Sequence, residues 1–485
     1  MTPAWAPAPL AVLAAKPSHP AFPARLPAAH WTLMWVSLGV AAAARLAADF
    51  SWQVTFTALF FLLSTAAMIR TLRLTLATRA LGPGMLAAGC WLFFALEAMA
   101  GALESPPFLV PSDLRIGESQ FSTRVVGDAL ICVAIYQLAL AGGYSLRLAP
   151  SLPIRALLFR LDTLRSRWAI TQVLIALLVL VPLYVAFGTD YDRAMRVIQQ
   201  ARAGSLDDMF PGLEMNLYWV SLFSCTVLLV EGVVYERRWG RWRAAVGLLL
   251  SSPLWLTGTR HLAVYLIMPV ILAWLLTQPG RGLGRKVIRM ILILLVVVVV
   301  LQAILLVRSY GWDHLAEVDL GQILTSKPTY QFESLLVAVY LVPQRHDYFY
   351  EPMTPFFVIH WIPRRLWPAK PIPAAWTYYN STWVENRKTN VTPSIIGQFY
   401  INWGTPGVVL IGFWLGWLTA MCDRVAARID PARQRLALVT LGMFYAFVFC
   451  SFRYYSPFYL QYWLFGALVM LALTRQRLRL PREAG

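Results

Sequence analysis

VVGDALICVAIYQLALAGGYS, the stretch at Val125–Ser145, decides how this chain folds. It carries a single charged residue, Asp128, and it is long enough to cross a membrane, because the hydrocarbon core takes a helix of about 20 residues. In lipid, the backbone N–H and C=O groups must bond within the segment itself, which selects a helix. The stretch therefore predicts a transmembrane helix.

Similar apolar stretches recur along the whole chain. Of the 485 residues, 58% are hydrophobic and 14% are charged, whereas soluble domains carry about 25% charged residues. The sequence therefore predicts an all-α integral membrane protein with about 12 transmembrane helices. The predicted spans are 29–48, 52–69, 84–103, 125–145, 168–188, 215–235, 244–258, 262–278, 288–307, 405–421, 436–452 and 457–474.

The basic residues gather in short clusters between these stretches. The net charge is +18, from 42 Lys and Arg against 24 Asp and Glu. Every second loop is basic, as the positive-inside rule requires of cytoplasmic loops. Both termini are therefore predicted to lie on the cytoplasmic side of the bacterial inner membrane. The sequence has no continuous basic stripe, which argues against a nucleic-acid partner. The clusters lie at 70–79, 147–167, 237–243, 281–289, 424–435 and 475–482.

Loops and tails complete the predicted organisation. Closely spaced prolines in the first 28 residues predict a disordered tail. The loop at 308–404 is much longer than about 15 residues, which is typical of a functional segment. Within it, Gln331–Pro343 is too short to span and is expected to lie at the interface or to re-enter. The divisions are a cytoplasmic tail at 1–28, helices 1–9 at 29–307, a large periplasmic loop with short interfacial helices at 308–404, helices 10–12 at 405–474 and a basic tail at 475–485.

Familiar cofactor and metal motifs are absent from the sequence. It contains no P-loop, no His-Glu-x-x-His and no Cys-x-x-Cys, so no cofactor and no metal site is expected. The cysteines lie in or beside apolar stretches and are expected to be packing residues. They are Cys90, Cys132, Cys225, Cys422 and Cys450.

The predicted outer loops contain a set of cations that suits an anion site. Arginine offers a planar fork that matches phosphate oxygens, so several arginines converging at the outer face would hold a lipid pyrophosphate and stabilise it as a leaving group. Alternatively, long translocated loops carry such residues without a function, because their charge does not control topology. The set comprises Arg260, Arg308, Lys327, Arg345, Arg364, Arg365, Lys370, Arg387, Lys388 and Arg453.

Four members of this set stand at two distinctive places. Arg260 lies in the tight turn Thr257–His261 between two predicted spans. The segment His360–Pro371 (HWIPRRLWPAKP) combines three cations with tryptophan and proline, which suits a rigid site for a glycosylated phospholipid. An interfacial aromatic anchor is the alternative interpretation of that segment.

Proton transfer needs a titratable group near the same face. Glu333 is the leading candidate because it interrupts an apolar run, and His360 and His261 are further candidates. Charged residues inside the predicted spans are expected to face the bundle interior and to pair there, as structural residues. These are Arg45, Glu97, Asp128 and Glu231.

Three stretches together resemble a known family. They are the Gly258–Arg260 turn, the Ile362–Pro371 segment (IPRRLWPAKP) and Thr392–Gly407 (TPSIIGQFYINWGTPG), which leads into a predicted helix. In combination they resemble the oligosaccharide repeat-unit polymerases of the O-antigen polymerase (Wzy-type) family. The resemblance covers mainly 251–457.

The resemblance implies a metal-independent membrane glycosyltransferase with a GT-C-like bundle, acting at the periplasmic face. Such enzymes join undecaprenyl-pyrophosphate-linked oligosaccharides and work beside a chain-length regulator and a flippase. The arginines of their outer loops bind the pyrophosphates. That role is carried over first to Arg260, Arg364 and Arg365, and then to Arg308, Lys370 and Arg453.

Other functions stay open from the sequence alone. An O-antigen ligase would have a similar bundle and outer loop, and a flippase or exporter of lipid-linked glycan would explain the number of spans. Transporters, however, usually bind near the midplane between repeated halves, and this sequence shows no repeat. An assembly subunit of a polysaccharide machine is the remaining alternative.

Overall fold

The structure is a computed structural model, and it describes the chain in separate stretches. These are residues 26–105, 107–110, 119–146, 222–235, 240–256, 260–277, 330–351, 393–429 and 435–453, together with Trp367, Ala369, Ala374, Ala375 and Tyr379. Within them, the regular elements are helices, and a single isolated bridge joins Leu109 to Gln120. The spans predicted at 168–188, 288–307 and 457–474 and the tails at 1–25 and 475–485 lie outside the described residues.

The N-terminal helices follow the first predicted spans closely. The helices α2 and α5 begin where a polar side chain accepts a backbone N–H: Asp49 from Trp52, and Ser122 from Val125. The helix α2 ends at Arg79, whose left-handed backbone (φ 59°) cannot continue a helix. The elements are α1 (Ala28–Arg45), α2 (Phe50–Thr78), α3 (Leu81–Cys90), η2 (Trp91–Ala95), α4 (Leu96–Leu103) and α5 (Thr123–Ser145).

The remaining described helices come from the second half of the chain. Each overlaps a predicted span except α15, which lies in the predicted outer loop; α18 begins ten residues before its span, within that loop. The elements are η4 (Glu231–Tyr235), α11 (Gly240–Leu256), α12 (Arg260–Thr277), α15 (Gln331–Leu341), α18 (Ile395–Ala426) and α19 (Arg435–Ser451).

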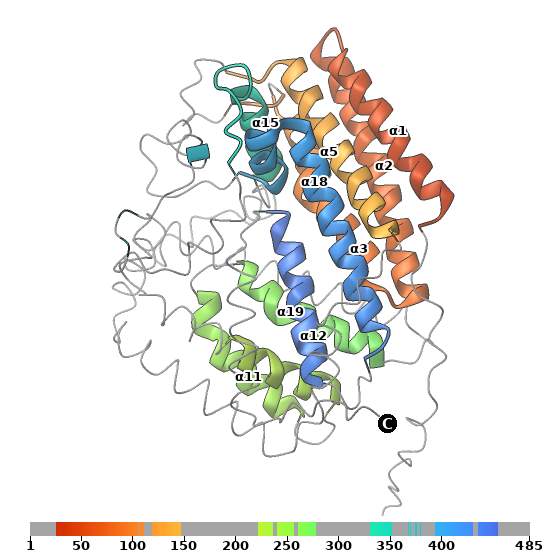
Figure 1. The fold of residues 1–485 in the computed structure, drawn as a ribbon, viewed down its shortest axis with the longest axis vertical. Helices are drawn as coiled ribbons and strands as arrows, with labels where there is room; N and C mark the ends of the chain where they lie inside the picture. The colour runs from red at the N-terminus through yellow and green to blue at the C-terminus, as the bar shows by residue number, and fades with distance from the viewer. Residues whose placement is uncertain are drawn as a thin grey trace, which may run out of the picture.

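The protein is a multi-pass membrane protein by the length and hydropathy of its helices. In the described part of the chain, four helices are long and apolar enough to cross a membrane: α2, the continuous rod Leu81–Leu103, α5 and α18. Figure 1 shows these helices and α1 running side by side, with α19 and α12 beyond them and α15 at one end.

Small residues let α5 and α18 pack backbone against backbone. A Cβ atom at Gly143 would lie 1.9 Å from the carbonyl oxygen of Phe413, and one at Gly416 would lie 2.1 Å from that of Leu140. In lipid, where apolar surfaces gain little by association, such close approach is a main source of helix pairing. These two helices therefore form a rigid pair on which the other elements are arranged.

Of the four charged residues predicted to face the bundle interior, Glu97, Asp128 and Glu231 are buried or partly buried, whereas Arg45, the last residue of α1, is exposed. Arg45 and Asp128 form an ion pair of 2.6 Å between α1 and α5. Glu97 and Glu231 are both buried, with 5% and 8% of their surface exposed. Charged groups in a membrane protein avoid lipid in this way because transfer into hydrocarbon is costly.

The two ends of the bundle are held by different contacts. At one end α15 packs among α4, α5 and α18, and we name this the α15 end. At the other, the carboxylate of Asp423 on α18 accepts hydrogen bonds from the backbone N–H of Gly82 (3.1 Å), from Tyr144 (2.6 Å) and from Tyr445, and we name this the Asp423 end. The loop charges predict that the α15 end faces outward.

The short helix α15 is buried in the bundle, which argues against the interfacial position expected of Gln331–Pro343 and leaves the re-entrant one. All of its residues except Glu333 are buried, so it presents no broad apolar face to lipid. Phe332 packs on Phe108, and Tyr340 packs on Phe121, with ring centroids 6.4 and 6.1 Å apart. The helix is thus an internal element of the bundle.

Candidate functional site

The site is built around the first turn of α15. The Oε2 atom of Glu97, on α4, accepts a hydrogen bond of 2.6 Å from the backbone N–H of Phe332. The first N–H groups of a helix have no partner within it, and a carboxylate there is favoured by the helix dipole. Glu97 therefore fixes the start of α15 to a membrane-spanning rod.

Glu333, the leading proton-transfer candidate, lies in this first turn. Its side chain is half-buried, in contrast to its neighbours along the helix. Beside it, the hydroxyl of Tyr379 donates to the Ser334 carbonyl (3.1 Å) and shares a 2.9 Å hydrogen bond with the Ser334 hydroxyl. Burial, with the negative charge of Glu333, raises the pKa of Tyr379 well above its ordinary value. Tyr379 is thus a neutral donor to Ser334, next to the predicted proton-transfer residue Glu333.

A break in α18 provides the second part of the site. Gly404 has φ 61° and ψ −150°, and Pro406 follows within the next turn, so the helix interrupts its hydrogen-bond ladder there. The carbonyls of Ile401 and Asn402 then accept from the backbone N–H groups of Phe349 (3.3 Å) and Tyr350 (3.0 Å). Residues 393–407 thereby hold the extended segment 346–351 against the α15 end.

Glycine is required at this break. The backbone at Gly404 is left-handed, and a Cβ atom there would lie 3.0 Å from the ring of Tyr348. That ring also packs on Tyr350 and Tyr400, with centroids 6.0 and 6.1 Å apart. Close approach at Gly404 therefore seats the extended segment.

Glu351 ends that segment and anchors another part of the chain. Its carboxylate accepts hydrogen bonds from the backbone N–H groups of Ala374 (2.6 Å) and Ala375 (3.1 Å), and its own N–H donates to the Asn402 side chain (3.2 Å). These contacts give Glu351 a structural role. They also hold the chain just beyond the cation-rich segment His360–Pro371 to the α15 end.

The π-helical turn η2 connects α15 with the end of α19. It contacts α15 directly, and its Phe93 stacks on Phe452, the residue before Arg453, at 6.3 Å. Phe452 also packs on Tyr136, near the middle of α5. The end of α19 therefore lies at about mid-depth of the bundle, and π-turns of this kind are frequent at functional sites.

Arg453 is exposed at that position. Within the described part of the chain its guanidinium makes no ion pair, and its backbone N–H donates to the carbonyl of Cys450. An unpaired cation at this depth is costly unless it faces water or an anion. Among the residues that the structure describes, Arg453 is therefore a cation positioned to pair with an anionic group.

The other predicted site residues are described in part or not at all. Arg260 and His261 are the first residues of α12, and their side chains lie outside the described residues. Five more predicted residues lie wholly outside the described part of the chain: Arg308, His360, Arg364, Arg365 and Lys370. Of the predicted residues, then, Glu333, Arg345 and Arg453 are those whose side chains the structure describes. The Arg345 guanidinium lies 4.3 Å over the ring of Tyr340 on α15, and the elements bearing Glu333 and Arg453 meet at η2.

Sequence reasoning missed four features of this site. Glu97 was identified only as a buried charge, and its contact with a residue 235 positions later is not visible in the chain order. The π-turn η2 and the Ser334–Tyr379 contact carry no sequence signal. The break at Gly404 did have one, since Gly-Thr-Pro-Gly at 404–407 combines two helix breakers with a second glycine.

Comparison of the chain with protein-family models, with curated proteins and with solved structures gives no match.

Proposed function

We propose that this chain is a membrane glycosyltransferase that polymerises undecaprenyl-pyrophosphate-linked oligosaccharide repeat units at the outer face of the bacterial inner membrane. The observation that carries the proposal is the construction of the α15 end. There, residues 393–407 hold the extended segment 346–351, and Glu333 lies half-buried in the first turn of α15, a helix too short to span. An arrangement of this kind suits a substrate whose lipid stays in the membrane while its sugars extend into water.

Under this proposal, Arg260 and Arg453 lie at the same depth of the bundle. The helices α12 and α19 touch at Pro269 and Gly442, where a Cβ atom on the glycine would lie 2.3 Å from the proline Cα. The loop charges predict that these helices run in opposite directions. Arg260 and Ser451 are each nine residues from that contact, so Arg260 and Arg453 would lie side by side.

The cation-rich segment His360–Pro371 is followed by an anchor at the α15 end. Lys370 precedes Ala374 by four residues, and the Glu351 carboxylate binds the Ala374 N–H. We propose that Arg364, Arg365 and Lys370, in the segment before this anchor, complete a pyrophosphate site with Arg260, Arg308 and Arg453.

In the proposed reaction, the arginines and Glu333 have separate roles. A hydroxyl of the acceptor unit attacks the anomeric carbon of the growing chain, and a carbon–oxygen bond forms there. The bond from that carbon to the lipid pyrophosphate breaks, and the arginines stabilise the charge on the leaving group. Glu333 accepts the proton that the attacking hydroxyl loses. No metal and no cofactor takes part in this scheme.

Surface glycan length tests the proposal. A strain without the gene is complemented with the wild-type chain, with Arg260→Ala, with Arg364→Ala or with Glu333→Gln, at matched expression. The expected phenotype of all three variants is glycan of a single repeat unit. Arg73→Ala is the matched control, because Arg73 is an exposed cation near the C-terminal end of α2, away from the α15 end. This variant should restore glycan of full length.

Other outcomes would replace this function. Long lipid-linked chains that never reach their final acceptor would indicate a ligase. Repeat units that accumulate on the inner leaflet would indicate a flippase. Full-length glycan in all three variants would remove these residues from the mechanism.

A further inference from the structure

The exposed side of α2 carries two arginines near the C-terminal end of the helix. Arg70 and Arg73 are both exposed, and they are one helical turn apart. They continue a stripe that includes Leu62 and Ile69, which are 62% and 44% exposed. Because α2 is long and apolar enough to cross a membrane, this stripe faces lipid.

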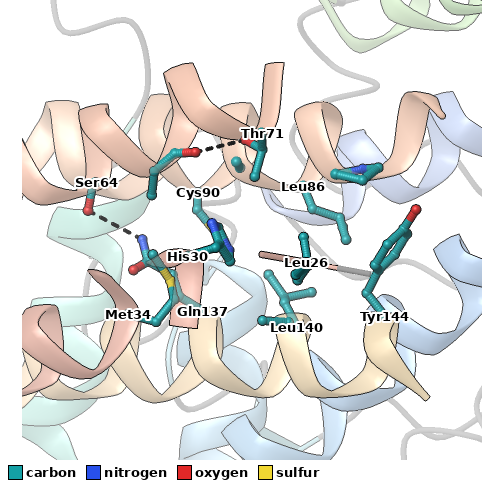
Figure 2. A pocket seen from close by; sticks show the side chains of 14 residues that line it. Leu26, His30, Met34, Ser64, Thr71, Leu86, Cys90, Gln137, Leu140 and Tyr144 are labelled. Atoms are coloured by element: carbon teal, nitrogen blue, oxygen red, sulfur yellow. Dashed lines mark hydrogen bonds between the residues drawn. The ribbon is translucent and has the colours of Figure 1, made fainter. Parts of the chain in front are cut away.

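The opposite side of α2 is turned into the bundle. Thr71 is 2% exposed and lines a small cleft together with His30 and Gln137 (Figure 2). A helix turns by about 100° per residue, so an inward Thr71 puts Arg70 and Arg73 on the outward side. The rotation of α2 within the bundle therefore commits both arginines to lipid.

The depth of the two arginines follows from the length of the helix. Trp52, near the other end of the exposed stripe, is 56% exposed, and tryptophan is enriched at the boundary between membrane and water. Arg70 and Arg73 follow Trp52 by 18 and 21 residues, which is about 27 and 32 Å of helix. The hydrocarbon core is about 30 Å thick, so the two guanidinium groups lie at the level of the phosphates of the opposite leaflet.

This level is the Asp423 end of the bundle. The Thr75 hydroxyl, just after Arg73, accepts the backbone N–H of Gly84 (2.9 Å), and the nearby N–H of Gly82 binds Asp423. The loop charges predict that the α15 end faces outward, and they therefore predict the cytoplasmic leaflet for the two arginines.

Neither arginine has a counter-ion in the part of the chain that the structure describes. There, no ion pair or hydrogen bond joins the guanidinium of Arg70 or Arg73 to another residue. The helices α1 and α3, which pack on α2, contain no Asp or Glu, and neither does α2 itself. Two neighbouring cations at the edge of the hydrocarbon are costly unless water or an anion meets them. The phosphates of the lipids are the anions available at this depth.

Other arginines described at the Asp423 end are arranged differently. Arg424 is only partly exposed and donates to the carbonyl of Leu146 (2.8 Å). Arg428 is exposed, but it lies beyond Ala426, the last residue of α18, and so is not on an apolar helix face. The pair on α2 therefore combines close spacing, a lipid-facing helix and the depth of the headgroups.

We propose that Arg70 and Arg73 form a binding site for the phosphate of an anionic glycerophospholipid in the leaflet at the Asp423 end. Their planar guanidinium groups donate paired hydrogen bonds to the phosphate oxygens, and the acyl chains lie along Leu62 and Ile69. Two positive charges favour a headgroup of net negative charge over a zwitterionic one. The site lies at the opposite end from the proposed glycosyl transfer and goes beyond that function.

Lipid binding to the purified full chain tests this site. Delipidated protein in detergent is titrated with phosphatidylglycerol or with phosphatidylethanolamine of the same acyl chains, and bound lipids are counted by native mass spectrometry. The wild type should bind the first phosphatidylglycerol about tenfold more tightly than the first phosphatidylethanolamine. Arg70→Ala and Arg73→Ala should each weaken the binding of phosphatidylglycerol about fivefold, and the double variant about twentyfold or more.

Matched controls separate this site from general charge and from folding. Arg428→Ala removes the same charge at the same end of the bundle without changing the face of α2, and it should leave the affinity for phosphatidylglycerol unchanged. All of these variants replace exposed side chains, so the free energy of unfolding in detergent should equal that of the wild type. Arg73→Ala should weaken lipid binding and still restore glycan of full length, so a failure of this site and a failure of the proposed function are distinguishable.

Photocrosslinking locates the bound lipid. Phosphatidylglycerol with a diazirine close to its headgroup should label residues 66–77 of α2, and labelled peptides are mapped by mass spectrometry. The double variant should lose this labelling, whereas Arg428→Ala should keep it.

Several results would overturn the proposal. Equal affinities for the two lipids would remove the preference for an anionic headgroup. An equal loss in Arg428→Ala and in the double variant would mean that the positive charge of the whole protein, and not this pair, attracts the lipid. Wild-type affinity in the double variant, or labelling confined to other helices, would exclude these arginines as the site. Inorganic phosphate that bound as tightly as phosphatidylglycerol would identify a free anion as the ligand.

Discussion

A buried carboxylate accepts a backbone N–H from the start of a helix at each end of the bundle, yet the two contacts join different kinds of element. At the Asp423 end, the carboxylate on α18 binds the first turn of α3 and the hydroxyls of Tyr144 and Tyr445 on α5 and α19. At the α15 end, Glu97 on α4 binds the first turn of a helix too short to span.

The difference separates bundle stability from the arrangement of the site. Asp423 ties together long helices that would be present without any outer loop. Glu97 ties one such rod to a segment that the membrane does not hold. Damage at the Asp423 end should therefore unfold the protein, whereas damage at the α15 end should displace the proposed site and leave the bundle folded.

The largest expected effect is that of Asp423→Ala. The change leaves two tyrosine hydroxyls and the N–H of Gly82 without their acceptor, at roughly 1–3 kcal/mol for each buried donor. The free energy of unfolding in detergent should fall by about 3 kcal/mol or more. Asp423→Asn keeps an acceptor oxygen and should cost less. Equal stability of the alanine variant and the wild type would contradict the stabilising role of this end.

Gly404→Ala should come next, and it should act at the other end. Alanine is strained in this backbone conformation and meets the Tyr348 ring, for a cost of about 1–3 kcal/mol that is confined to the outer segments. Limited proteolysis should cut the segment 346–351 faster, and surface glycan should shorten. The control is Gly142→Ala, where a Cβ atom meets nothing within 4 Å. If both variants resist the protease equally, the extended segment does not depend on the break in α18.

Glu97→Gln should have a smaller and more local effect. The amide still offers an oxygen to the Phe332 N–H, but it removes the charge that strengthens the bond, for a loss of about 1 kcal/mol. Hydrogen exchange at Phe332 should accelerate about fivefold, while exchange in the core of α5 stays unchanged. An equal acceleration in both places would mean that Glu97 stabilises the whole bundle, as Asp423 does.

The smallest expected effect is a pH dependence at the start of α2, also at the α15 end. The Trp52 N–H and then the Ser51 hydroxyl bond to Asp49 and hold its pKa below the ordinary 3.8. A lowered folded pKa means that the stabilisation is complete above pH 3.8 and is lost as the pH falls through the lower, folded value. Hydrogen exchange in the first turn of α2 should therefore rise only in acid. Asp49→Asn caps the helix without titrating, and a rise of the same size in that variant would exclude Asp49 as the cause.

The sequence predicted the described helices well and their assembly hardly at all. The first four spans and α11, α12, α18 and α19 appear where apolar length and basic loops put them, because lipid requires helices of a fixed minimum length. Arg45, Glu97 and Asp128 were expected inside the bundle for the same energetic reason. In contrast, α15 was expected at the interface or re-entering. A short apolar sequence does not distinguish a helix covered by lipid from one covered by protein.

The candidate site divides in the same way. Its residue types, above all Glu333 and the outer-loop arginines, were available from composition and position alone. Which of them meet depends on contacts between residues hundreds of positions apart, such as Glu97 with Phe332, and on the side-by-side packing of elements around η2. Chain order carries no information about such distances.

The sequence by itself determined that this chain lives in a membrane and where its described helices run, because the bilayer imposes one dominant rule on every segment. Only the tertiary structure decided that α15 is internal, that Gly404 opens α18 to the segment 346–351, and that His30 and Gln137 share a cleft. Those features arise from backbone approaches of a few ångströms and from single hydrogen bonds, which no hydropathy pattern encodes.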